Sequence, residues 1–235
     1  MARSYETIVE RYVGRIVDGE LQPGERLPRE EDLAAEFAMS RGVAREAIRA
    51  LEERGLVRVT HGRGQSVADV QDWKVLDPDV LAALLTSSDA RSLIAELIEC
   101  RLICEVDAAA LAAERATAAD RAALAERFDA LSARRGTRPR DRADALAAER
   151  AFHEAIVAAA GNRPLAQILR PVLAALEQAG DRLPARRAAL EERRQILEAI
   201  LAKDAGAARA AMETHLRGLA RAVSRGRKGR GTRRR

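Results

Sequence analysis

The chain has 235 residues, 47% of them apolar and only 3% aromatic, so it can form one or two domains whose cores consist mainly of Leu, Ala, Ile and Val. No apolar run approaches the roughly 18 residues that a membrane-spanning helix needs, and the N-terminus lacks the apolar core of a signal peptide. We therefore expect a cytoplasmic protein that binds no membrane. The net charge of +5 arises in the last twelve residues, which hold seven basic side chains and no acid.

The first 70 residues predict three helices and a β-hairpin. Apolar spacing over residues 5–21 predicts the first helix, and residues 29–39 form a second, short one with acidic side chains in its first turn. Ser40 can cap a third helix, which ends at Gly55. Alternating residues and a tight turn over 57–67 predict a hairpin. This order of elements is typical of a winged helix-turn-helix.

The third helix carries two stripes of side chains. Apolar residues from Ala44 to Leu51 recur at helical spacing, and Arg41, Arg45 and Arg49 follow on the adjoining arc, each about 40° further round. A recognition helix needs this division, because one face packs while the other reaches the major groove, where the arginine fork suits guanine or phosphate. The alternative is a solvated amphipathic helix with ion pairs between its turns.

The turn of the hairpin would form the tip of the wing. His61, Gly62 and Arg63 can enter a minor groove or lie along phosphates, or they form an ordinary hairpin turn. Residues 1–70 carry 11 basic and 13 acidic side chains. A nucleic-acid interface would therefore depend on where individual arginines point rather than on overall charge.

After a linker at 71–79, only helices are predicted. Residues 80–223 predict an all-α bundle, which makes the fold class mainly α. We expect Cys100 and Cys104, four apart on one helix face, to be small buried hydrophobes without a disulfide between them. The helices of this part are expected at 79–87, 89–116, 117–134, 142–160, 163–180, 185–203 and 204–224.

The last segment, residues 224–235, is a Gly/Arg run that cannot pack, so we expect a basic disordered tail. The tail is either simply solvated or an arm that binds phosphates without regard to sequence. As an arm, it would raise the affinity for any DNA and steepen its salt dependence.

The segment 21–67 resembles the DNA-binding domain of the GntR family of bacterial transcription regulators. The matching pieces are, in order, L-x-P-G-x-x-L-P, S-R-x-x-x-R-E-A, L-x-x-x-G-L-V and H-G-x-G-x-x-V. The resemblance implies a homodimer whose two recognition helices contact a palindromic operator in double-stranded DNA. By position, Arg41 and Arg45 match the family's base- and phosphate-contacting arginines, and His61 and Gly62 match its wing-tip contacts. The candidate DNA-binding residues are therefore Arg29, Ser40, Arg41, Arg45, Arg49, His61, Gly62 and Arg63.

One position departs from the family pattern. Glu31 stands where an operator-contacting arginine is common. A carboxylate there would repel phosphate or accept a hydrogen bond from a cytosine amino group, and the nearby Arg29 would partly compensate its charge. The operator sequence cannot be copied from relatives for this reason.

Residues 80–223 resemble the all-helical effector domain, FCD, of the FadR-like branch of that family. The resemblance implies a small carboxylate as effector, and the segment 72–81, DWKVLDPDVL, is similar to regulators that respond to sugar acids. Arg101 matches an arginine that lines the effector pocket, or it forms only a helix pair with Glu105. Asn162 is a further effector contact, or only a residue at the start of a helix.

In many members the effector domain holds a divalent metal through an acid, a histidine four residues later and two further histidines. Glu149, His153 and His215 match three of these ligands, and carboxylate plus imidazole suits Zn, Ni or Mn. The fourth position is Arg193, which has no lone pair to donate. We interpret all four as effector-binding residues, with the Arg193 guanidinium supplying the positive charge that a metal supplies in relatives. The alternative is a metal on the other three, with water completing its shell.

The sequence thus predicts a ligand-responsive transcription regulator. A second reading is a nucleoid-type architectural protein without an effector, which would lose most of its DNA affinity when residues 224–235 are deleted. A third is an all-α metal-dependent hydrolase that uses Glu149 and His153. The chain has no Gly-rich phosphate loop, HExxH motif or nucleophile elbow, so we predict that it is not an enzyme.

Overall fold

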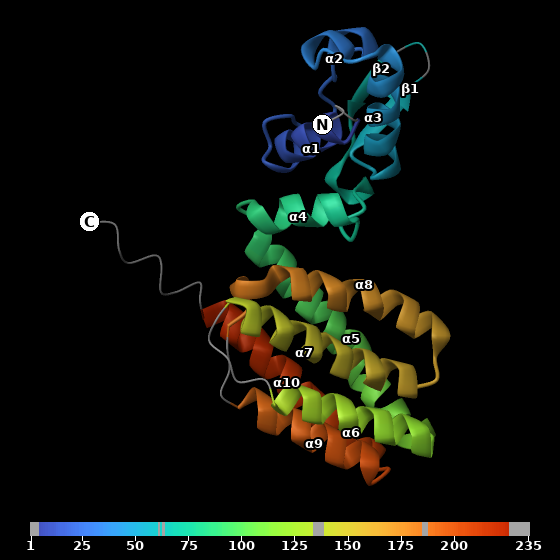
Figure 1. Cartoon of the computed structure of the whole chain (residues 1–235), viewed down its shortest axis with the longest axis vertical. Coiled ribbons are helices and arrows are strands. Elements are labelled where there is room, and N and C mark those ends of the chain that lie inside the picture. Colours follow the sequence, from blue (N-terminus) through green and yellow to red (C-terminus); the bar gives the residue numbers. More distant parts are fainter. Residues whose placement is uncertain (1–4, 61, 63, 134–138, 185–187, 226–235) are drawn as a thin grey trace, which may run out of the picture. The chain divides into compact units, whose positions relative to one another are not determined.

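The computed structural model describes residues 5–60, 62, 64–133, 139–184 and 188–225 (Figure 1). The chain forms two compact units, which divide between Ala90 and Arg91. Two of the predicted wing-tip residues, His61 and Arg63, lie outside the described residues, as does the predicted tail from residue 226 onward.

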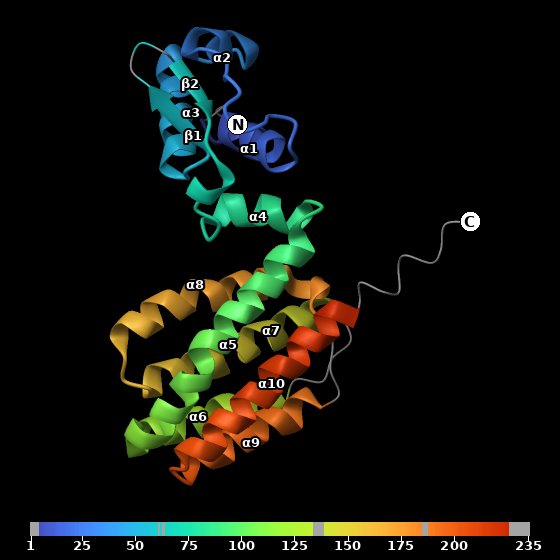
Figure 2. The same cartoon turned by 180° about the vertical axis from the view of Figure 1, so that it is seen from behind.

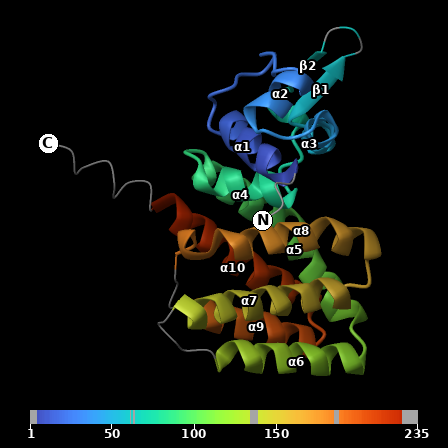
Figure 3. The same ribbon diagram turned by 45° about the horizontal axis from the view of Figure 1, so that its top comes forward.

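The N-terminal unit contains the predicted three helices and hairpin. Strand β1 pairs antiparallel with β2, with Val57 opposite Val67 and Thr60 opposite Gly64. Helix α3 packs against α1, α2 and β1, and the hairpin lies beside it in both Figure 1 and Figure 3. The predicted winged helix-turn-helix is confirmed. Its elements are α1 (Tyr5–Val17), α2 (Glu30–Glu36), α3 (Arg41–Glu53), β1 (Val57–Thr60), β2 (Gly64–Val67), the short 3₁₀ helix η1 (Val70–Asp72) and α4 (Pro78–Thr86).

Both ends of α3 are fixed by single residues. At its start, the Val43 N–H donates a hydrogen bond to the Ser40 hydroxyl oxygen over 3.3 Å, which confirms the predicted cap. Just beyond its end, Gly55 has a φ of +73°, and a Cβ at this position would lie 2.0 Å from the carbonyl oxygen of Asp72. Only glycine fits there, so the chain can turn sharply and close on the segment that follows the hairpin.

The segment predicted as a linker, 71–79, is folded into the N-terminal unit. The Trp73 indole N–H donates to the Ala68 carbonyl over 3.4 Å, and the Lys74 N–H donates to the Arg54 carbonyl over 2.9 Å. Helix α4 then contacts α1 and buries Val80, Leu81, Leu84 and Leu85. The division between the units therefore falls later than residue 80, where the sequence analysis begins the effector domain.

The C-terminal unit is an all-α bundle, as predicted. Among its described helices, α7 contacts both α6 and α8, and α9 contacts α6 and α10. Figure 2 shows α5 and α10 on one side of the bundle, and Figure 1 shows α7 and α8 on the other. The elements are α5 (Ala90–Arg115), α6 (Ala118–Ser132), α7 (Pro139–Ala159), α8 (Arg163–Ala179), the 3₁₀ helix η2 (Gly180–Arg182), α9 (Ala189–Leu201) and α10 (Ala205–Arg225).

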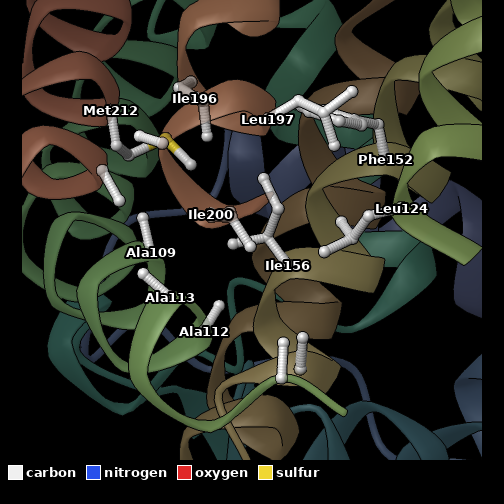
Figure 4. Close-up of a cluster of buried hydrophobic side chains, with 14 of the residues drawn as sticks. Ala109, Ala112, Ala113, Leu124, Phe152, Ile156, Ile196, Leu197, Ile200 and Met212 are labelled. Carbon is white, nitrogen blue, oxygen red and sulfur yellow. The ribbon is translucent and has the colours of Figure 1, made fainter. Parts of the chain in front are cut away.

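The core of this bundle is built from aliphatic side chains. Figure 4 shows Ile156 of α7 and Ile200 of α9 next to each other, with Ala109, Ala112 and Ala113 of α5 on one side of them. The labelled side chains that α5 contributes to this core are small. The near absence of aromatic residues is therefore compatible with a continuous buried core.

Two further predictions concern the cysteines of α5 and the absence of a membrane-spanning helix. Cys100 and Cys104 both carry free thiols, as expected, but both are half-buried rather than buried. Within the described ranges, none of the helices combines the length and apolar character that crossing a membrane requires.

Candidate DNA interface and effector site

The side chains predicted to contact DNA gather on α3 and at the start of α2. Arg41, Arg45 and Arg49 are exposed, whereas the apolar stripe of the same helix is buried. Arg29 immediately precedes α2, where its backbone N–H donates to the Asp32 carboxylate over 3.2 Å. The predicted division of α3 into a packed face and an arginine face is therefore present in the structure.

Each of the three arginines of α3 is paired with a carboxylate. The Arg41 Nη1 lies 3.0 Å from Glu31 Oε1. Arg45 donates through Nε to both carboxylate oxygens of Glu30, at 3.1 and 3.3 Å. On α3 itself, Arg49 donates through Nη1 to Glu46 over 3.2 Å. Sequence reasoning singled out Glu31 but missed Glu30, although acidic residues in the first turn of α2 were the available signal.

Gly62 is the described residue of the predicted wing tip. It is exposed and has a φ of +75°, a conformation that glycine adopts without strain. This backbone geometry explains why a glycine occupies the turn. The contact of Gly62 with DNA stays a prediction.

The candidate effector site begins with a buried chain of polar groups. Arg101 donates through Nε and Nη2 to the two carboxylate oxygens of Glu105, and the His153 Nδ1 lies 2.7 Å from Glu105 Oε2. All three side chains are buried. Burial alone would raise the pKa of Glu105, but Arg101 and then His153 outweigh it and lower this pKa to about 2.

The state of His153 follows from the same contacts. Burial and the nearby Arg101 lower its pKa below the usual range, so the ring is neutral at neutral pH. The carboxylate of Glu105 accepts from Nδ1–H, which leaves the lone pair on Nε2. Among the described residues, this Nε2 has no hydrogen-bond partner, and the ring stacks on that of His215 with centroids 5.4 Å apart.

His215 is oriented in the same way by a different acid. Its Nδ1 lies 2.9 Å from Glu192 Oε2. Two buried histidines thus each direct one nitrogen toward a carboxylate that sequence reasoning did not assign. Glu105 was considered only as a partner of Arg101, and Glu192 was missed.

Arg193 and Glu149 form an ion pair beside these histidines. The Arg193 side chain is 9% exposed and that of Glu149 is 27% exposed. Burial would raise the pKa of Glu149, but Arg193, followed by His153 and Arg101, lowers it. The guanidinium predicted to supply positive charge to an effector is therefore paired with a carboxylate of the same predicted site.

A cavity of about 190 Å³ opens onto this ion pair. It lies among α7, α9 and α10 and combines two guanidiniums, one carboxylate and one imidazole with an apolar wall. Its lining consists of Arg142, Ala145, Leu146, Glu149, Leu183, Pro184, Ala189, Arg193, His215 and Leu219. The structure thus brings Glu149, Arg193 and His215 together at one cavity and adds Arg142, which sequence reasoning missed.

Three predicted effector residues are not among those that line this cavity: His153, which stacks on His215, and Arg101 and Asn162. Arg101 is occupied by Glu105 and is not among the residues that line this cavity, so the alternative of a buried helix pair describes its contacts. Asn162 caps α8, because its side-chain oxygen accepts from the Leu165 N–H over 3.2 Å. It does not line the cavity either.

The residues do not fit the four-ligand metal site that the family resemblance implies. Glu149, His153 and His215 each offer a ligand atom, and these atoms lie within 4.8 Å of one another. However, the fourth position holds the guanidinium of Arg193, which cannot ligate a metal and is bonded to Glu149. A cation bound there would have to displace Arg193 from Glu149, which is one of the three residues that could ligate the cation.

Comparison with known proteins gives matches for both units. Residues 4–67 match the family model described as bacterial regulatory proteins, gntR family, and residues 96–218 match the FCD domain model. The galactonate operon transcriptional repressor of Escherichia coli (strain K12) is 34% identical over 165 residues, covering 70% of each chain. The HTH-type transcriptional regulator LutR of Bacillus subtilis (strain 168) is 31% identical over 210 residues, covering 86% of this chain and 92% of the relative.

A similar architecture is found in a solved structure. Streptococcus agalactiae GntR has a TM-score of 0.53 and 26% sequence identity, and the alignment covers 92% of this chain and 99% of that one. The combination of a winged helix and a helical bundle therefore extends over nearly the whole of both chains.

Proposed function

Because the chain belongs to the GntR family of bacterial transcription regulators and carries an FCD domain, we propose that it binds a palindromic operator as a homodimer and responds to a small carboxylate. GntR regulators bind DNA operators, and FCD domains bind small-molecule effectors. The observation that supports the effector part of the proposal is the Arg193–Glu149 ion pair at the wall of the 190 Å³ cavity.

The proposed DNA interface is the exposed face of α3. Arg41 and Arg45 reach base edges or phosphates in the major groove, and Gly62 brings the hairpin tip close to the backbone of the DNA. Ser40 fixes the start of the helix. This assignment is supported by the separation of the arginines from the buried stripe of the same helix.

The proposed effector site is the cavity at Arg193. An arginine fork offers a carboxylate two directed donors as well as charge. An incoming carboxylate would replace Glu149 as the ion-pair partner of Arg193, so that binding exchanges one carboxylate for another. His215 and the Arg142 side chain line the same cavity and would contact the remaining polar groups of the effector.

A sugar acid is the effector class that we propose. The cavity places donors and acceptors beside an apolar wall, which suits a small, polar and hydroxylated carboxylate. One relative is named for a galactonate operon, and galactonate is a sugar acid. Aldonates, galactonate among them, are therefore the first ligands to test by thermal shift of the purified protein.

The proposed mechanism is allosteric. Occupation of the effector domain changes the relative placement of the two DNA-binding units of the dimer. The affinity for the operator falls because the duplex fixes the spacing of the two half-sites.

The DNA interface predicts a loss of binding in the Arg45→Ala variant. Operator binding should weaken by about 1–3 kcal/mol per half-site if Arg45 contacts a base. Arg49→Ala is the matched control, since Arg49 lies further round the helix and should matter less. A gel-shift titration at physiological salt measures both. Unchanged affinity of the Arg45→Ala variant would remove this residue from the interface.

The arginine in the fourth ligand position predicts a low metal content. Protein purified without chelator should contain well below one equivalent of Zn, Ni or Mn per chain, because Arg193 repels a divalent cation a few ångströms away. Elemental analysis measures this content. A stoichiometric metal on Glu149, His153 and His215 would show that Arg193 does not replace it.

A further inference from the structure

The unit that carries the proposed DNA interface is not positively charged. Its residues 1–70 contain 11 basic and 13 acidic side chains. Phosphate binding without sequence preference depends on exposed positive charge. Residues 1–70 instead carry two more acidic than basic side chains. The positions of the acids, rather than their number, therefore need a physical explanation.

Two of these acids lie against the proposed DNA-reading arginines. Glu30 and Glu31 occupy the first turn of α2, where the helix dipole favours negative charge. Because α2 packs on α3, their carboxylates reach Arg45 and Arg41, at 3.1 and 3.0 Å.

These ion pairs are exposed. The side chains of Arg41 and Glu31 are 69% and 63% exposed, and those of Arg45 and Glu30 are 58% and 32% exposed. Exposed pairs contribute little to stability. Their main consequence is therefore that they neutralise the charge which α3 presents to DNA.

Each carboxylate engages only part of the guanidinium with which it pairs. The bonds from Arg45 to Glu30 use Nε alone, and the ion pair of Arg41 with Glu31 is made through Nη1. A guanidinium has five N–H donors. An arginine whose Nε is held by a carboxylate can still donate to guanine through its terminal nitrogens.

We propose that Glu30 and Glu31 are specificity-determining residues, which neutralise Arg41 and Arg45 toward phosphates while they orient them toward base edges. This inference rests on the proposed DNA interface. Non-specific complexes lose the Coulomb attraction between arginine and phosphate. Operator complexes keep the directed hydrogen bonds to bases, so the two acids increase the ratio of operator to non-specific affinity.

The test uses the full chain and two DNA probes. These are a random-sequence duplex and an operator selected from a random library with the wild-type protein. Glu31→Gln and Glu30→Gln should each tighten binding to the random duplex about three- to tenfold at low salt, because one negative charge near the phosphates is removed. Operator affinity should change less, and the slope of log affinity against log salt should steepen.

Glu20→Gln is the matched control. It removes the same charge from an ion pair in which Arg15 of α1 lies 3.3 Å from Glu20, a residue that follows this helix. It should change the affinity for random duplex less than twofold. An effect of Glu31→Gln no larger than that of Glu20→Gln, or a larger loss of affinity for operator than for random duplex, would overturn the inference.

The outcome is also separable from that of the proposed function. If Arg45→Ala leaves DNA binding unchanged, Arg45 is not part of the interface and the premise of this inference fails. If Arg45→Ala weakens operator binding while Glu31→Gln behaves like Glu20→Gln, only the role of the acids is refuted. Thermal unfolding of each variant checks that the fold is retained.

Discussion

Replacing Glu105 by alanine is expected to lower the free energy of unfolding by about 3–5 kcal/mol. Arg101 and Glu105 are 3% and 0% exposed, and Glu105 also accepts from His153. Removing the carboxylate leaves a buried guanidinium without its counter-charge and a buried imidazole N–H without its acceptor. The cost therefore comes mainly from the partners that remain rather than from the lost contact.

Chemical denaturation of the full chain measures this effect, and two variants serve as controls. Glu99→Ala changes an exposed acid of the same helix and should stay within about 0.5 kcal/mol of the wild type. The double variant Arg101→Met with Glu105→Leu removes both charges and should recover most of the loss. A Glu105→Ala variant as stable as Glu99→Ala would contradict the buried ion pair.

The same carboxylate predicts how stability depends on pH. The pKa of Glu105 is about 2 in the folded protein, against its ordinary value of 4.5. Since the unfolded chain takes up this proton at higher pH, the stabilisation is present above about pH 4.5 and is lost as the pH falls toward 2. Glu105→Gln should therefore show a shallower loss of stability than the wild type over this range.

Replacing Arg193 by alanine is expected to abolish the response to the effector while operator affinity stays the same. Arg193 lies at the cavity wall and pairs with Glu149, in the C-terminal unit. Loss of a charge-assisted, two-donor contact to a carboxylate costs about 1.5–3 kcal/mol or more. Effector affinity should therefore fall at least about tenfold, and no release from the operator is expected at ligand concentrations that just saturate the wild type.

The measurement is calorimetric titration of the aldonate that most stabilises the wild type, followed by operator binding with that ligand present. Arg194→Ala is the control, because Arg194 is the neighbouring arginine but is half exposed and pairs with Glu191. It should retain the response. Arg193→Lys keeps the charge without the fork and should bind the effector with intermediate affinity. A normal response of the Arg193→Ala variant would refute the proposed role.

Local signals in the sequence were sufficient for the fold. The cap at Ser40 sets the start of α3 through a neighbouring backbone N–H, and Gly55 ends the helix with its positive φ. Helical periodicity likewise placed the helices of the bundle. The packing of residues 71–79 was not predictable, because it depends on the close approach of Asp72 to Gly55, which no local pattern reveals.

The candidate sites were only partly predictable. Sequence spacing placed Glu149 and His153 on one helical face, and the resemblance added Arg193 and His215. The acid that orients each histidine comes from another helix: Glu105 for His153 and Glu192 for His215. Pairings across helices depend on how the helices pack, so they could be assigned only from the structure.

The proposed control of DNA binding by a carboxylate is tested most directly by fluorescence anisotropy of a labelled operator at fixed protein concentration. The titrant is the aldonate that binds the wild-type protein with a saturable isotherm. If a carboxylate controls DNA binding in this way, operator affinity falls as this ligand saturates the protein, with a midpoint that matches its binding constant. Saturation of the protein without any change in operator affinity would contradict it.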